Sequence, residues 1–159
     1  AGLIERLPSS GDRRRRYVRL IREPLARLSP VTTGSVRPAL FICTHNAARS
    51  QLAAALWRSR TGQPARSAGT DPAPAVHPAA RAAAARAGLE LGPVTPTPLD
   101  PADGPGPDLV ITVCDRACEE LAAPVDWWHW STPDPIPIGT DAAFDQTVAE
   151  LDLRITALL

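Results

Sequence analysis

A cysteine and an arginine lie six positions apart in the segment Cys43-Thr44-His45-Asn46-Ala47-Ala48-Arg49-Ser50. The apolar run 38–42 precedes this segment, and the helix-like stretch 51–57 follows it. A strand, a loop of small residues and a helix start can cradle a tetrahedral oxyanion, because loop amides and the helix N-terminus direct N–H groups at one spot. The same field favours a thiolate at Cys43, and the fork of donors on Arg49 can clamp the anion. The segment therefore predicts a nucleophile and its anion clamp on a single loop.

Strand and helix patterns alternate from residue 38 onward. We expect strands over 38–43, 65–69, 108–114 and 126–130, with helices over 50–61, 77–87, 116–122 and 141–158. The stretch 92–107 is rich in proline and glycine and should be a loop. This alternation predicts a three-layer α/β fold with a four-stranded parallel sheet and helices on both faces. Function then belongs at the carboxyl ends of the strands, where Cys43, Cys114 and the loop after Trp130 fall.

The first 40 residues differ from the rest in charge. They hold nine arginines against three acids, whereas the remainder holds eight arginines against fourteen acids. The pattern predicts a basic hairpin and a short helix over 1–28, a linker over 29–37 and one larger domain over 38–159. The chain contains no methionine, so we expect Ala1 to be an internal or processed start.

The Cys43-to-Arg49 spacing, with Ser50 next, resembles the active-site loop of the low-molecular-weight protein tyrosine phosphatases and of the arsenate reductases that share their fold. Four further segments match in the same order along residues 38–159: Ser67-Ala68-Gly69-Thr70, Val76-His77-Pro78, 108–115 (Asp-Leu-Val-Ile-Thr-Val-Cys-Asp) and 129–135 (His-Trp-Ser-Thr-Pro-Asp-Pro). The resemblance implies the low-molecular-weight phosphatase fold, preceded here by the hairpin and helix arm.

The resemblance also implies roles for individual residues. Cys43 would attack the oxyanion, Arg49 would hold its equatorial oxygens, and Asp134 would protonate the leaving oxygen. Taken alone, Asp134 between two prolines is equally typical of a turn. The oxyanion-binding loop would comprise Thr44, His45, Asn46, Ala47, Ala48, Arg49 and Ser50. Asn46 would brace that loop through Ser67, Ser50 would lower the pKa of Cys43, and His45 would be a polar loop residue.

Phosphatases and arsenate reductases of this kind share the first step and diverge at the second. A phosphatase hydrolyses the cysteinyl phosphate with water, whereas a reductase needs a thiol to attack the cysteinyl arsenate. The motif Thr-Val-Cys-Asp and the aliphatic residues after Asp134-Pro135 are closer to the sequences of the arsenate reductases than to those of the phosphatases. We therefore expect a thiol-dependent arsenate reductase. The alternatives are a tyrosine phosphatase and a non-catalytic oxyanion sensor within a transcriptional regulator.

Cys114 and Cys118 are candidates for a redox relay. Thioredoxin-coupled members pair the cysteine matched by Cys114 with one seven residues on, where this chain has Leu121. Two cysteines four residues apart on one rigid helix are poorly placed for a disulfide, and buried structural thiols are the simpler interpretation. We therefore expect an external reductant, mycothiol with mycoredoxin or thioredoxin. No histidines accompany the cysteines at zinc spacing, so we expect no metal site.

Residues 1–21 resemble the wing of an arsenic-responsive winged-helix regulator, with Gly-Leu-Ile-Glu-Arg in the first strand and Tyr-x-x-Leu ending the second. The resemblance implies a regulator–reductase fusion whose DNA-binding domain lies upstream of Ala1. The residues facing DNA phosphates would be Arg13, Arg14, Arg15 and Arg16. A solvated basic arm is an equal alternative. We expect a cytoplasmic protein, because no apolar run reaches membrane-spanning length and no secretory signal precedes the arm; self-association stays open.

Overall fold

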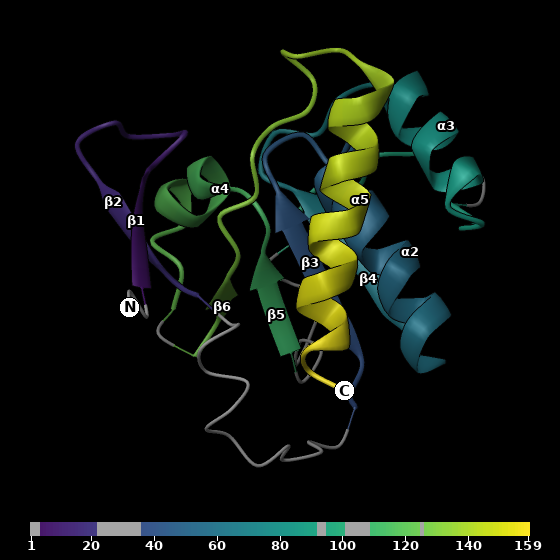
Figure 1. The fold of residues 1–159 in the computed structure, drawn as a ribbon, viewed down its shortest axis with the longest axis horizontal. Coiled ribbons are helices and arrows are strands. Elements are labelled where there is room, and N and C mark those ends of the chain that lie inside the picture. Colours follow the sequence, from purple (N-terminus) through teal and green to yellow (C-terminus); the bar gives the residue numbers. More distant parts are fainter. Residues whose placement is uncertain (1–3, 22–35, 92–94, 101–108, 125) are drawn as a thin grey trace.

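A four-stranded parallel sheet forms the centre of the computed structural model, which describes residues 4–21, 36–91, 95–100, 109–124 and 126–159. Its strands run in the order β4-β3-β5-β6 and comprise β3 (Ala39–Cys43), β4 (Ala65–Gly69), β5 (Leu109–Thr112) and β6 (Trp128–His129). A separate antiparallel hairpin is formed by β1 (Ile4–Pro8) and β2 (Arg16–Leu20). The sheet and the hairpin (Figure 1) confirm the predicted α/β architecture.

Four helices flank the sheet in the described residues: α2 (Arg49–Thr61), α3 (Pro78–Arg86), α4 (Asp115–Glu120) and α5 (Asp141–Thr156). Their ends follow local chemistry. Gly62 ends α2 in the left-handed conformation, with φ of 68°. His77 and Thr140 cap the starts of α3 and α5 with their side chains. Within these ranges no helix is long and apolar enough to cross a bilayer.

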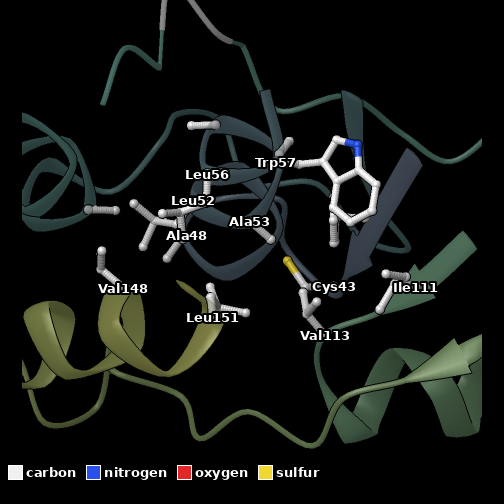
Figure 2. Close-up of a cluster of buried hydrophobic side chains, with 14 of the residues drawn as sticks. Cys43, Ala48, Leu52, Ala53, Leu56, Trp57, Ile111, Val113, Val148 and Leu151 are labelled. Atoms are coloured by element: carbon white, nitrogen blue, oxygen red, sulfur yellow. The ribbon is translucent and has the colours of Figure 1, made fainter. Parts of the chain in front are cut away.

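Strand β3 forms the middle of the core. All five of its residues are buried, which is typical of a parallel strand covered on both faces. Phe41 lies 5.9 Å, centroid to centroid, from both Trp57 on α2 and Trp130 after β6. Helices α2 and α5 pack against each other beside the strand, and Figure 2 shows Cys43 among these apolar side chains, close to Val113. Cys43 therefore lies at the end of the fully buried central strand.

Several predicted boundaries shift by a few residues. Strand β5 ends at Thr112 rather than 114, because Cys114 becomes the side-chain cap of α4. The described part of the predicted loop, 95–100, runs beside the end of β4: Gly69 N donates to Thr97 O at 2.9 Å, and Leu99 N donates to Gly69 O at 2.9 Å. The predicted helix over 22–28 and most of the linker over 29–37 lie outside the described residues.

Candidate active site

The loop between β3 and α2 curls tightly at the end of the sheet. Asn46 takes a positive φ of 48°, which asparagine tolerates better than most side chains. Gly69, at the end of β4, lies directly beneath the loop: a Cβ at this position would lie 2.7 Å from Thr44 O and 3.0 Å from Asn46 N. Glycine is therefore required where β4 supports the loop.

The sulfur of Cys43 lies at the start of α2 and is surrounded by donors. Ser50 Oγ lies 3.0 Å from Sγ, and the amide N of Asn46 donates to Sγ at 3.2 Å. Burial raises the pKa of this thiol, and nearby Cys114 raises it further, whereas the Ser50 hydroxyl and Arg49 lower it. Ser50 acts in the predicted direction, but burial outweighs it.

Replacing Ser50 by alanine should make Cys43 still harder to ionise. The variant loses the hydroxyl that favours the thiolate, and only the thiolate reacts with iodoacetamide. We expect the pH profile of Cys43 alkylation, followed by mass spectrometry, to move to higher pH, with a fall of roughly tenfold in rate at neutral pH for each unit of pKa. Ser67→Ala is the matched control, and superimposable profiles for Ser50→Ala and wild type would contradict the role of Ser50.

Asn46 holds the loop closed through three hydrogen bonds. Its Nδ2 donates to Ser50 Oγ at 2.8 Å, while its Oδ1 accepts from Gln51 Nε2 at 2.8 Å and from the amide of Thr97 at 2.9 Å. The predicted brace through Ser67 is therefore replaced by Gln51 and Thr97, because Ser67 lies in register with Phe41 in the middle of the sheet rather than beside the loop. Thr97 comes from the segment predicted as a plain loop, and no sequence signal marked it.

Arg49 joins the loop to the segment that carries the predicted acid. Arg49 is 7% exposed; its Nη1 donates to Thr132 O at 3.1 Å and its Nη2 to Asp134 Oδ2 at 2.8 Å. Asp134 Oδ1 also accepts the amide of Ile136 at 3.1 Å. We refer to residues 131–136 as the acid loop. The guanidinium has five N–H donors, so others can engage an oxyanion while these bonds fix its orientation.

The remaining loop residues have supporting positions. His45 is exposed, and its Nδ1 lies 2.9 Å from Asp71 O, which agrees with a polar loop residue. Ala47 and Ala48 are buried. The carbonyl of Ala47 accepts the amide of His77 at 2.8 Å, which links the loop to the start of α3.

Cys114 lies against the wall of the loop, whereas Cys118 does not. The sulfur of Cys114 is 3.4 Å from Thr44 Oγ1 and accepts the amide of Ala117 at 3.4 Å as the cap of α4. Cys118 is half-buried one turn along α4, with its amide donating to Cys114 O at 3.2 Å. All three cysteines are free thiols, and Cys114 contacts Thr44, the residue that follows Cys43 in the loop.

The four arginines predicted to face DNA lie away from this site. Arg13 to Arg16 are exposed on the hairpin, where Arg14 pairs with Asp12 at 3.0 Å. Among the described residues, no cluster of three or more histidine, cysteine, aspartate or glutamate side chains could hold a metal ion.

Comparisons with known proteins find solved structures that share this fold. Two solved arsenate reductases are similar to this chain. The thioredoxin-dependent enzyme of Corynebacterium glutamicum is 30% identical, with 77% of this chain and 60% of that chain covered and a TM-score of 0.61. The arsenate reductase of Archaeoglobus fulgidus is 28% identical, with 76% of this chain and 97% of that chain covered and a TM-score of 0.62. The tyrosine phosphatase Wzb of Escherichia coli K30, solved with sulphate, shares the fold (24%, 75% and 93%, 0.67).

No match was found among curated proteins. The comparisons also give no support to the winged-helix resemblance of residues 1–21, so DNA contact by Arg13–Arg16 stays an unsupported prediction. The description of the low molecular weight phosphotyrosine protein phosphatase family matches residues 39–159. These residues hold the sheet, the cysteine loop and the acid loop, and the chain belongs to that family.

Proposed function

We propose that this chain is an arsenate reductase that uses Cys43 as its nucleophile and Cys114 as the second thiol. The observation that carries the proposal is the position of Cys114, whose sulfur lies 3.4 Å from Thr44 Oγ1, one residue from the nucleophile. Hydrolysis of a cysteinyl phosphate needs water alone, whereas reduction of arsenate needs a second thiol. A buried free thiol on the wall of the loop therefore favours reduction.

The first step is displacement at arsenic. Cys43 attacks as the thiolate, and the proton of its thiol, whose pKa burial raises, passes to the incoming oxyanion. The new S–As bond forms as the As–O bond opposite breaks, Asp134 protonates the departing oxygen to water, and Arg49 stabilises the equatorial oxygens. Since Arg49 already donates a hydrogen bond to Asp134, the residue that holds the equatorial oxygens and the residue that protonates the leaving oxygen reach the substrate together.

The second step transfers the electrons. The Cys114 thiolate attacks Cys43 sulfur, an S–S bond forms, and the electron pair of the S–As bond moves to arsenic. Arsenic(V) becomes arsenic(III), arsenite leaves, and one disulfide remains. An external reductant, thioredoxin or mycothiol with mycoredoxin, then returns the disulfide to two thiols.

The proposal is tested by measuring arsenite formed from arsenate by the purified protein, with thioredoxin and with mycothiol–mycoredoxin in parallel, beside aryl phosphate hydrolysis. Arsenite with either donor would support the reductase and identify its reductant. Aryl phosphate hydrolysis with no arsenite would establish the phosphatase alternative. Oxyanion binding without turnover in any arm would favour the sensor alternative.

Replacing Cys114 by serine separates an internal second thiol from an external one. Serine caps a helix start well, so α4 should persist. We expect arsenite formation to fall to background with both donors, while aryl phosphate hydrolysis keeps at least half of its rate. Unchanged arsenite formation would show that an external thiol attacks Cys43 directly.

The complete Cys43, Arg49 and Asp134 set also supports phosphoryl transfer, because the first step is the same for phosphate and arsenate. Ile136, two residues after Asp134, is aliphatic and packs partly buried against the core. This position therefore places no aromatic side chain at the entrance to the site. We therefore rank tyrosine phosphatase activity second.

A further inference from the structure

The N-terminal hairpin presents two different faces. On β2, Val18 is 59% exposed, and its register partner Arg6 on β1 is exposed as well. Leu7 and Tyr17, also register partners, are partly covered, and the Tyr17 ring lies 4.5 Å from the ring of His129. Figure 1 shows the hairpin beside α4. One face therefore packs on the family domain, although the family match begins only at residue 39.

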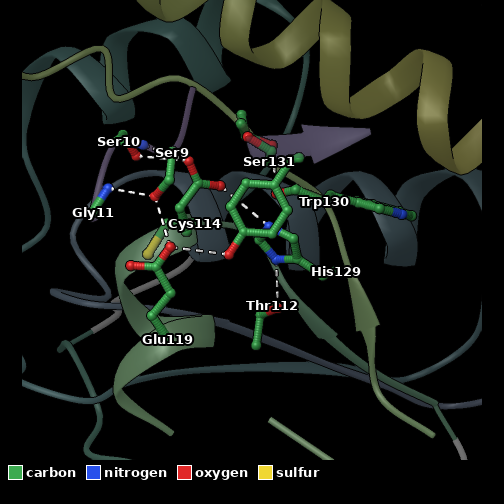
Figure 3. Close-up of polar contacts among 12 residues, drawn as sticks. Ser9, Ser10, Gly11, Thr112, Cys114, Glu119, His129, Trp130 and Ser131 are labelled. Atoms are coloured by element: carbon green, nitrogen blue, oxygen red, sulfur yellow. Dashed lines mark hydrogen bonds and ion pairs between the residues drawn. The ribbon is translucent and has the colours of Figure 1, made fainter. Parts of the chain in front are cut away.

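The hairpin turn is hydrogen-bonded to α4 through Glu119. Ser9 is 3% exposed and donates its hydroxyl to Glu119 Oε1 at 2.7 Å, while the amide of Asp12 donates to Glu119 Oε2 at 2.9 Å. Ser9 Oγ in turn accepts the amides of Gly11 at 2.9 Å and Asp12 at 3.0 Å. Tyr17 adds a hydrogen bond from its hydroxyl to Glu119 at 3.2 Å. Both carboxylate oxygens of Glu119 are thus held by the turn, and Figure 3 shows Ser9 between Gly11 and Glu119.

Asp115, at the start of α4, connects the turn to the acid loop. It is 2% exposed and accepts Ser10 N at 2.7 Å, Ser10 Oγ at 3.1 Å and His129 Nε2 at 3.2 Å. The Ser131 hydroxyl also hydrogen bonds to it. Burial opposes its ionisation, but His129, the Ser10 amide and Ser131 outweigh burial and lower its pKa to about 2. A buried, ionised carboxylate with donors from three segments fixes those segments relative to one another.

These segments meet next to the reacting groups. Asp115 directly follows Cys114, and Ser131 precedes Thr132, whose carbonyl orients Arg49. A groove of about 550 Å³ lies between the turn, the acid loop and α5, lined in part by Ser10, Asp115, Ser131 and Pro133. The hairpin turn and the acid loop therefore share Asp115 as a hydrogen-bonding partner and line the same groove.

We infer that the hairpin turn positions the catalytic residues. The turn binds Asp115 and Glu119 through Ser9, Ser10 and Asp12. These hydrogen bonds position α4 and hold the acid loop in place for Asp134. The hairpin residues touch no reacting atom, so they are positioning residues. The inference rests on the proposed role of Asp134 as the acid.

Gly11→Ala tests the inference directly. A Cβ at this position would meet Glu119 Oε2 at 2.6 Å and the backbone of Arg116 at 3.1 Å, so the new methyl group pushes the turn away from α4. We expect faster hydrogen exchange in peptides covering 115–120 and 131–136, with exchange in α2 unchanged. Val18→Thr, on the exposed face of the same hairpin, is the matched control and should match wild type.

A kinetic measurement adds a signature that loss of stability alone would not produce. If the acid loop shifts, hydrolysis of phenyl phosphate, which has a poor leaving group, should slow about tenfold, while hydrolysis of p-nitrophenyl phosphate slows about twofold. Tyr17→Phe removes only the hydroxyl bond to Glu119 and keeps the ring against His129. Tyr17→Phe should also slow phenyl phosphate hydrolysis more than p-nitrophenyl phosphate hydrolysis, but by a smaller factor. It is the variant to use if Gly11→Ala does not fold.

Unchanged exchange over 131–136 in Gly11→Ala would overturn the inference, whether or not the hairpin itself exchanges faster. An equal slowing with both phosphate esters would overturn it as well. Hydrogen exchange requires no turnover, so wild-type protein that is inactive in every assay would defeat the proposed function and still leave the exchange result to decide the role of the hairpin.

Discussion

Replacing Cys43 by serine is expected to abolish turnover of arsenate and of aryl phosphates. The hydroxyl of serine is a far weaker nucleophile than a thiolate, and the loop offers it no general base: Ser50 Oγ and the Asn46 amide, the contacts of the sulfur, favour an anion but do not remove a proton. Loss of a nucleophile of this kind costs on the order of 10⁴-fold or more in kcat. The measurement is initial rate with both substrates.

The same variant should keep its fold. Serine is slightly smaller than cysteine and can use the same two hydrogen-bonding partners, so the free energy of unfolding should change by no more than about 1–2 kcal/mol. Thermal unfolding followed by circular dichroism checks this. Cys118→Ser is the control in the aryl phosphate assay, in which no thiol is oxidised, and should retain activity. Measurable hydrolysis by Cys43→Ser above background would contradict a cysteine nucleophile.

The sheet was predictable because its signals are local. The apolar run of β3, the small-residue loop and the helix pattern of α2 adjoin one another, and their order predicts a parallel strand–helix unit. The end of β5 was less predictable: Val113 and Cys114 look like strand residues, but the chain turns there to let Cys114 cap α4. Local patterns predict which elements form, whereas tertiary contacts determine where they end.

The site was predictable only where its residues share a motif. Cys43, Arg49 and Ser50 are on one loop, so their spacing revealed them. Thr97 supports that loop from about fifty residues away through its backbone amide, and any residue other than proline offers an amide. The hydrogen bond from Ser9 to Glu119 joins residues 110 positions apart, and no local pattern predicts it either. The burial that raises the pKa of Cys43 likewise had no local signal, because the depth of a side chain depends on the whole fold.

Replacing Asp134 by asparagine should slow both reactions by about 10²- to 10⁴-fold, the usual contribution of a positioned general acid. The amide oxygen can still accept from Arg49 or from the Ile136 amide, so the acid loop should keep its place while the transferable proton is lost. The leaving group then departs without protonation. We therefore expect a larger loss for phenyl phosphate than for p-nitrophenyl phosphate, measured as kcat for each ester.

Asp71→Asn is the matched control, since Asp71 is a well-exposed carboxylate beside His45 and the substitution removes the same charge. It should change kcat less than about twofold. An equal loss for both esters in Asp134→Asn would show that the aspartate only orients Arg49, because an orienting role acts on the oxyanion and is indifferent to the leaving group. A loss that grows with leaving-group basicity identifies the acid, and Gly11→Ala should then show a weaker form of the same dependence.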